Sequence, residues 1–321
     1  MKRYFVKIIV FGFIALMTFI PICLKIKTSQ TEKIKNAVLL PNGSSVLAVG
    51  HSHIECSLDP IFFPGLINQA KSSEQPLYSI AKANLFIQHN PTIKTIILAW
   101  SYFGLDTPTK IIQETGYDPF SIYFPILIDS PLICELYRKD NTAYFFKNYI
   151  ISKFGFPSKK LINDYFHNKN RLQIKLDFEG CFLNEYKAAL DKDDLSKKVG
   201  NKNKDFPLSE IRNYIDPIAQ KNLENFFSES QKKGIKVVIF NAPTHKDYNN
   251  SFHPRIIETM DNFATELCEK YNMTYIDFHT YPLPDSMFRD YNHINTEGAK
   301  IITPLLRDTL QKLGIIETIM L

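Results

Sequence analysis

Short apolar runs that alternate with helical patterns are the feature that most constrains how this chain folds. Each run is four or five residues long, which suits a buried strand, and longer segments with helical spacing lie between the runs. The predicted strands are residues 45–49, 95–99, 236–240 and 274–277. The predicted helices are residues 72–89, 216–233, 254–271 and 296–313. Strands separated by helices indicate an α/β fold with a parallel sheet covered by helices on both faces.

The segment between the two halves of this pattern does not continue it. Residues 107–206 are rich in Tyr, Phe, Lys and Asn and include a charged stretch at 191–205. We expect this segment to be a partly helical insertion that packs over one edge of the sheet. The 321 residues are enough for one large domain or two small ones with a sizeable core.

The N-terminus predicts a membrane anchor. Residues 1–7 are basic, and residues 8–24 form a 17-residue run without charge, which as a helix would span roughly 25 Å. The run ends without the small residues of a signal-peptidase site, and the bulky Ile22 before Cys23 disfavours a lipoprotein. We therefore expect residues 1–30 to be an uncleaved single-pass anchor, with the main domain, residues 31–321, outside the cytoplasm. Lysines on both sides of the run leave its orientation open.

Charge and cysteine usage exclude some functions. The net charge of +5 comes entirely from five basic residues among the first 30, so residues 31–321 are neutral. A neutral body gives no reason to expect nucleic acid as a partner. The five cysteines show no C-x-x-C spacing, so neither a zinc site nor a disulfide framework is indicated and buried free thiols are favoured.

In open parallel sheets, ligands bind beyond the carboxyl ends of the strands. Polar residues follow the predicted strands of this chain at these positions. Residues 50–53 (GHSH) follow the first strand, residues 100–102 (WSY) the second, and residues 241–245 (NAPTH) the third. Residues 290–293 (DYNH) stand directly before the last helix.

The glycine-x-serine turn after the first strand and the late D-x-x-H motif resemble those of the SGNH (GDSL-type) hydrolase superfamily. The resemblance covers about residues 45–110 and 215–315 and implies a three-layer α/β/α, flavodoxin-like domain. It also implies that Ser52 is the nucleophile, that His293 is its base and that Asp290 orients the histidine. Such a serine needs the imidazole to accept its proton, so the Ser52 and His293 side chains should lie within about 4 Å.

The N-terminal anchor and the D-x-x-H motif followed by Asn295 and Gly298 are similar to those of membrane-anchored, extracytoplasmic members of this superfamily. Those members include alginate O-acetylation proteins and the D-alanyl transfer protein of teichoic acid synthesis. The resemblance implies an esterase or O-acyltransferase that acts on a cell-surface glycan, beside a membrane-bound acyltransferase. It implies neither a cofactor nor a metal.

The chain departs from the superfamily at positions that affect the oxyanion hole. His51 stands in place of the usual Asp, no glycine occurs near residues 70–73, and residues 100–102 lack the usual Asn. Backbone amides at Ser52 and near Ser72 are candidate oxyanion donors, and the hydroxyls of Ser101 and Tyr102 are candidate substitutes for the Asn.

Further residues are candidates for lining the site. His245 and Tyr248 follow the third predicted strand. Trp100, the only tryptophan, suits either stacking on a sugar ring or a place in the core.

Two other functions stay open. His51 and His53 are spaced to share a metal ion, with Asp277 and His279 or the D-x-x-H pair as further ligands. The chain lacks the eight strand–helix units of the barrel hydrolases that use such a motif. Alternatively, a catalytically degenerate SGNH domain would bind glycan or act as a scaffold in the cell envelope.

Overall fold

The computed structural model describes residues 38–72, 74–102, 105 and 215–317, together with isolated positions among the first 21 residues. Two compact units divide the chain: Met1–Leu39 with Asp118–Ile174, and Leu40–Tyr117 with Lys175–Leu321. Nearly all described residues belong to the second unit. The predicted insertion and most of the predicted anchor lie outside the described residues. In the part that is described, no helix is both long and apolar enough to cross a membrane.

A five-stranded parallel sheet forms the centre of the second unit. Its strand order is β2-β1-β3-β4-β5, which is the flavodoxin-like order of a doubly wound sheet. The strands are β1 (Val46–Val49), β2 (Leu66–Asn68), β3 (Thr95–Trp100), β4 (Lys236–Asn241) and β5 (Thr274–Asp277). The predicted parallel sheet is therefore confirmed, with β2 as an additional strand at one edge.

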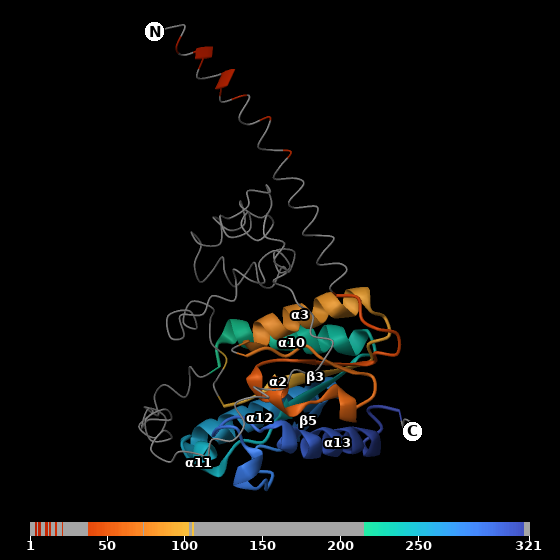
Figure 1. Ribbon diagram of the computed structural model, residues 1–321, viewed down its shortest axis with the longest axis vertical. Coiled ribbons are helices and arrows are strands. Elements are labelled where there is room, and N and C mark those ends of the chain that lie inside the picture. Colours follow the sequence, from red (N-terminus) through yellow and green to blue (C-terminus); the bar gives the residue numbers. More distant parts are fainter. Residues whose placement is uncertain are drawn as a thin grey trace. The chain divides into compact units, whose positions relative to one another are not determined.

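Helices cover both faces of this sheet. Figure 1 shows α3 and α10 side by side on one side of the sheet and α13 on the other. Trp100 of β3 stacks on Phe263 of α12, with ring centroids 6.1 Å apart, which places α12 on the same face as α3 and α10. The helices are α2 (Ser52–Ser57), α3 (Pro76–His89), α10 (Pro217–Lys232), α11 (Lys246–Asn249), α12 (Pro254–Tyr271) and α13 (Thr296–Lys312), with single 3-10 turns at Pro60–Phe62 and Asp285–Met287.

Proline and capping side chains define where the long helices begin. Pro76, Pro217 and Pro254 each stand at the first turn of a helix, where a missing N–H costs nothing. Asp216 caps α10 through bonds from the next turn's amides. The predicted start of the first long helix at residue 72 was wrong, because α3 begins at Pro76, and it has no side-chain cap.

The central strands β1, β3 and β4 are almost entirely buried, as expected for a parallel sheet between two helical layers. On one face, alternate residues such as Ala48, Ile97 and Phe240 pack against Ile302 and Leu306 of α13. Burial of each large apolar side chain contributes roughly 1.5–3 kcal/mol, so this layer holds α13, and the loop before it, firmly against the sheet.

Candidate active site

The turn after β1 is built around a close approach of two strands. Gly50 has φ +142°, and a Cβ added there would lie 2.0 Å from the Cβ of Ala99 on β3. Only glycine fits such a position. The chain then passes through His51, whose Nδ1 accepts a hydrogen bond from the His53 amide at 3.3 Å, and enters α2 at Ser52. The serine hydroxyl therefore stands at the carboxyl edge of the sheet.

The Ser52, His293 and Asp290 side chains form a continuous hydrogen-bonded row. Ser52 Oγ lies 2.7 Å from His293 Nε2, within the distance expected from the sequence. His293 Nδ1 lies 2.8 and 3.0 Å from the two carboxylate oxygens of Asp290, and the His293 backbone amide donates to the same carboxylate at 2.9 Å. A carboxylate against Nδ1 favours the tautomer whose Nε2 accepts the serine proton.

Asp290 is held in its ionised form. Burial by itself would raise the pKa of its carboxyl group, but the hydrogen bond and charge of His293 hold the pKa below its ordinary value. The Asn292 amide and Arg289 add to this lowering. The carboxylate thus remains available to orient His293 well into the acid range.

The loop that carries His293 is fixed by the start of α13. The Asn295 side chain accepts a hydrogen bond from the Gly298 amide at 2.9 Å and caps the helix. A Cβ at Gly298 would lie 2.8 Å from the backbone oxygen of Met287 and 3.0 Å from Ile294. The glycine therefore allows α13 to approach the loop that carries His293 closely, which explains the Asn-x-x-Gly spacing after the motif.

His53 is buried and His51 is half-buried beside this row. The ring centroids of His51 and His53 are 4.5 Å apart, and those of His53 and His293 are 5.5 Å apart. Burial, aided by the charge of His293, lowers the pKa of His51 to about 4, while a hydrogen bond to the Trp100 backbone opposes the lowering. Burial also lowers the pKa of His53. Both rings are neutral near pH 7.

The described residues do not support the metal alternative. Nδ1 of His51 is occupied by the cap of α2, and His293 is bonded to Ser52 and Asp290. Within the described ranges, no group of three or more His, Cys, Asp or Glu side chains is arranged to hold a metal ion. His51 instead performs the capping that an Asp would perform at this position.

Two backbone amides remain available as oxyanion donors. For neither Ser52 nor Ser72 does an acceptor for the backbone N–H lie among the described residues. The neighbouring amides of Ala70 and Lys71 are already bonded, to the Asn68 side chain and to the Gly50 carbonyl. The Lys71 bond places the loop after β2 directly beside the nucleophile turn.

Ser101 lies at the same edge of the sheet. The register of β1 with β3 pairs Val49 with Leu98, so Ser101 leaves β3 close to the level at which Ser52 leaves β1. This half-buried serine is thus near the position where the superfamily has an Asn.

The remaining predicted side chains belong to the framework. Trp100 is 1% exposed and lies in the core, so it offers no sugar-stacking surface. His245 caps α11 and packs against Phe288 and Tyr291, which supports the catalytic loop. Tyr248 is buried, with its ring centroid 6.4 Å from that of His53.

Tyr102 belongs to a second polar network, beyond β5. Its hydroxyl lies 2.9 Å from His279 Nδ1, which is 2.7 Å from both carboxylate oxygens of Asp277. Tyr275 donates to Asp261 at 2.6 Å in the same network. Burial raises the pKa of Tyr102, with Asp277 and Asp261 adding to the effect. The sequence signal for this network is the D-x-H motif at the end of β5, Asp277 and His279, which by itself indicates only candidate metal ligands.

Glu55 was not among the predicted site residues. It lies three residues after Ser52 on α2, and its carboxylate accepts a hydrogen bond from the Ser72 hydroxyl at 2.6 Å. The predicted oxyanion residue Ser72 is therefore linked to the nucleophile helix through its side chain. The i, i+3 spacing is the only local signal for this role.

Cys56, on the same helix, corrects another expectation. The sequence favoured free thiols, but Cys56 is disulfide-bonded. Cys268, on α12, is a free, buried thiol as expected.

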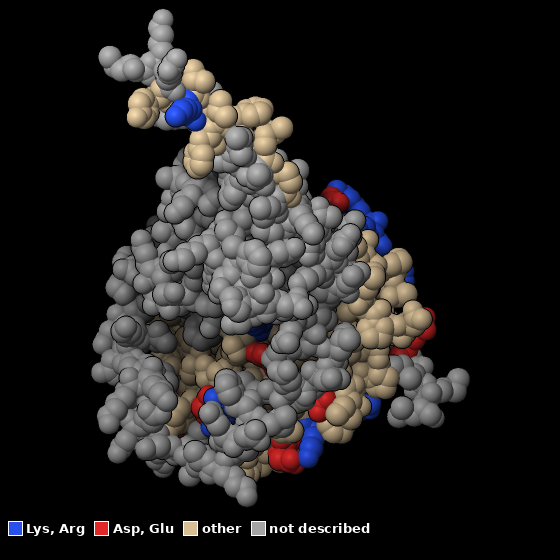
Figure 2. Space-filling model, turned by 45° about the horizontal axis from the view of Figure 1, so that its top comes forward, with Lys and Arg blue, Asp and Glu red and all other residues tan. Residues whose placement is uncertain are grey.

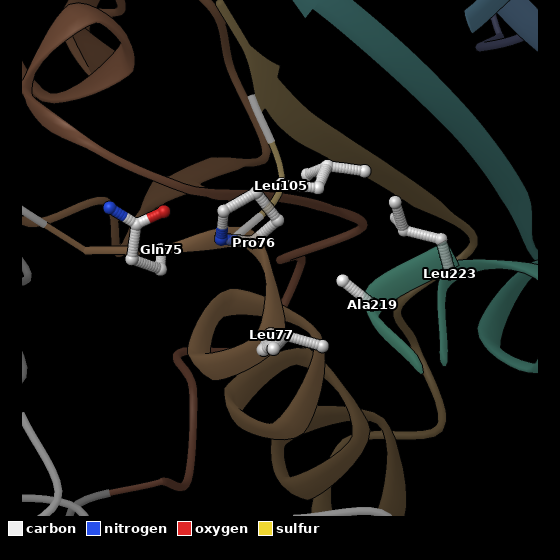
Figure 3. Close-up of a pocket in the computed structure, with 6 residues that line it drawn as sticks. All are labelled: Gln75, Pro76, Leu77, Leu105, Ala219 and Leu223. Carbon is white, nitrogen blue, oxygen red and sulfur yellow. The ribbon is translucent and has the colours of Figure 1, made fainter. Parts of the chain in front are cut away.

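A small apolar pocket lies between α3 and α10 and contains no residue of the triad. Its lining comes from the first turns of α3 and α10 and from the segment after β3 (Figure 3), namely Gln75, Pro76, Leu77, Ala219, Leu223 and Leu105. None of these side chains offers a nucleophile or a titratable group. On the face in view in Figure 2, acidic and basic side chains of the described residues are interspersed rather than gathered into a patch of one sign.

Neither a protein-family model nor a curated protein matches this chain. Among solved structures, it is similar to a candidate acylhydrolase from Bacteroides fragilis NCTC 9343, with 10% identity and a TM-score of 0.40 over 87% of this chain and 94% of the other. It is also similar to the psychrotrophic esterase EstA from a Pseudoalteromonas species, with 11% identity and a TM-score of 0.37 over 84% of this chain and 98% of the other. Similarity at this level carries no functional assignment.

Proposed function

We propose that this protein is an SGNH-like serine esterase or O-acyltransferase that acts through an acyl-Ser52 intermediate. The observation that carries the proposal is the 2.7 Å contact between Ser52 Oγ and His293 Nε2, backed by Asp290 on the other ring nitrogen. A nucleophile, a base and a group that orients the base are the parts that acyl transfer requires. The His293 side chain is 14% exposed, so a substrate reaches the row from solvent.

The first half-reaction forms the acyl-enzyme. Ser52 Oγ attacks the carbonyl carbon of an ester while its proton passes to His293 Nε2, and Asp290 stabilises the resulting imidazolium. The carbonyl oxygen becomes an oxyanion, which the amides of Ser52 and Ser72 receive. The ester C–O bond then breaks, and the departing alkoxide takes the proton from His293 Nε2 and leaves as an alcohol.

The second half-reaction releases the acyl group. A water molecule or an acceptor hydroxyl attacks the acyl carbon while His293 takes its proton. The bond to Ser52 Oγ breaks, and Ser52 recovers a proton from His293. Water as the attacking group gives hydrolysis and a sugar hydroxyl gives transfer, so one site serves both reactions.

The substrate that we propose is an acylated glycan or another polymer of the cell surface. The apolar run at residues 8–24 supports a single-pass anchor, and its proximity to the membrane would suit a membrane-bound acyltransferase as partner. The disulfide at Cys56 supports an extracytoplasmic location, because disulfides persist in oxidising compartments. The neutral body supports a partner other than nucleic acid.

A specific observation favours a second function. Residues 100–102 provide no Asn at the end of β3, and loss of one oxyanion donor costs roughly 10²–10³ in turnover. A domain with an incomplete oxyanion hole would bind glycan or organise an envelope complex without catalysis.

Labelling with a fluorophosphonate distinguishes the two functions. We expect the wild-type protein to be labelled and to hydrolyse small aryl acetates, and we expect Ser52→Ala to lose both properties. Ser228→Ala, on α10 and away from the site, is the matched control and should retain them. An active wild type whose rate survives Ser52→Ala would refute the mechanism, and a wild type without labelling or turnover would favour the non-catalytic function.

A further inference from the structure

The loop between β2 and α3 is held in place without a glycine. Two of its amides bond to the carbonyls of the β1 end: Gln69 N donates to Ala48 O and Lys71 N to Gly50 O, both at 2.8 Å. The loop thereby follows the backbone of the nucleophile turn over two successive bonds. These two bonds fix the path of the backbone from Gln69 to Lys71. Beyond Lys71, hydrogen bonds of side chains hold the loop.

A buried ion pair supports the loop from the side of α3. Lys82 Nζ lies 2.6 Å from Glu74 Oε2 and also donates to the Gln69 carbonyl. Ser79 donates to the other carboxylate oxygen of Glu74 at 2.7 Å. The Lys82 and Glu74 side chains are only 10% and 1% exposed. Burial of a charge pair is favourable only when further hydrogen bonds satisfy it, and here these bonds join both ends of the loop to one helix.

Glu55, on α2, holds the middle of the loop through a second contact. Its carboxylate oxygen accepts a hydrogen bond from the Ser72 hydroxyl at 2.6 Å. Glu55 and Ser52 are on the same short helix, so the nucleophile and the group that holds Ser72 move together. The Ser72 side chain is engaged by this bond, while no described residue accepts its backbone N–H.

We propose that Glu55 is a positioning residue that, through the Ser72 hydroxyl, holds the Ser72 backbone N–H toward the oxyanion. In the superfamily that this chain resembles, a glycine at this loop contributes to the oxyanion hole. We infer that the Glu55–Ser72 hydrogen bond orients the loop amide here in place of that glycine. This inference rests on the proposed function, because an oxyanion forms only if Ser52 attacks an acyl group. Glu55 itself touches neither the substrate nor the reacting atoms, and its negative charge is not needed for the role.

Steady-state kinetics with an aryl acetate test this assignment on the full-length protein. Glu55→Ala and Ser72→Ala should each lower kcat about 10-fold or more, less than the loss of a whole donor, while KM changes less than about 3-fold. Glu55→Gln retains a hydrogen-bond acceptor and should keep kcat within about 3-fold of the wild type. The double variant Glu55→Ala/Ser72→Ala should be no slower than the slower single variant, because both changes remove one bond.

Controls separate this inference from the proposed function. Glu229→Ala, an exposed change on α10, should leave both constants unchanged. Wild-type turnover that depends on Ser52, together with full kcat in Glu55→Ala or equal losses in Glu55→Ala and Glu55→Gln, would overturn the role of Glu55 alone. A wild type without Ser52-dependent turnover would overturn both. If Glu55→Ala does not fold, Ser72→Ala tests the same bond from its other end.

Discussion

At the scale of single residues, His51 shows how one side chain can replace another by making the same hydrogen bond. The superfamily usually has an Asp before the serine, and an Asp side chain accepts a hydrogen bond at the start of a helix. His51 Nδ1 accepts that bond from the His53 amide. The replacement places a titratable imidazole ring where it is shielded from solvent. We therefore expect the free energy of unfolding to depend on pH.

We expect acid to destabilise the fold partly through His51. An imidazole in the unfolded chain titrates near pH 6.5, whereas in the fold the pKa of His51 is about 4. Between these pH values the unfolded chain binds the extra proton, so stability falls as the pH drops through this window. From pH 7 to pH 5 the loss due to His51 is about 2 kcal/mol.

The variant His51→Asn should reduce this loss, because the amide oxygen can cap α2 but does not titrate. Urea unfolding at pH 7 and pH 5 measures the difference between the two stabilities. His253 caps α12 in the same way, through a bond that solvent reaches, so His253→Asn is the matched control and should behave like the wild type. Equal acid sensitivity of His51→Asn and wild type would contradict the prediction.

At the scale of elements, the site depends on three connections at the carboxyl edge of the sheet. The turn from β1 into α2 presents Ser52, the loop before α13 presents His293, and the loop from β2 to α3 brings Ser72 beside them. Each connection is short and is tied by side chains to a neighbouring helix. The packing of α2, α3 and α13 therefore determines how rigidly the site is held.

The ion pair beneath the β2–α3 loop gives a test at this scale. Lys82→Met leaves the Glu74 carboxylate buried without its partner, and we expect a loss of roughly 3–5 kcal/mol in the free energy of unfolding. The double variant Lys82→Met/Glu74→Gln removes both charges and should recover a large part of that loss. Chemical denaturation of the wild type and both variants measures the effect, and a double variant as unstable as Lys82→Met would argue against it.

At the scale of the whole molecule, the fold brings two residues from distant parts of the chain together at one site. Ser52 and His293 are 241 residues apart in the sequence, and the parallel sheet between them directs the ends of all its strands to one edge. The described strands begin at Val46. The apolar residues 8–24 precede this strand and lie largely outside the described part.

Removal of residues 1–27 should therefore leave a folded, soluble protein. We expect this shortened chain to unfold cooperatively, to remain in the supernatant without detergent and to react with a fluorophosphonate at Ser52 as the full chain does. Size-exclusion chromatography and circular dichroism check these outcomes. Aggregation of the shortened chain, with a full chain that behaves well in detergent, would mean that the N-terminal run is part of the fold.

Local pattern was sufficient for the long elements of this fold. The bounds of α12 and β5 match the sequence prediction at both ends, because proline marks the helix start and the apolar period changes sharply between the two elements. The strands β1, β3 and β4 differ from their predicted bounds by a single residue at one end. The D-x-x-H motif and the serine turn were also visible, because each is contiguous in the chain.

The tertiary structure alone decided the rest. The strand β2 has three residues and α2 has six, too few for a hydrophobic period to be recognised, and both form because the sheet and α13 pack against them. The bond between Glu55 and Ser72 joins residues 17 positions apart, and the network of Tyr102 with His279 joins residues 177 apart. Sequence periodicity reports which face of an element is buried, whereas contacts of this kind depend on which elements the fold sets side by side.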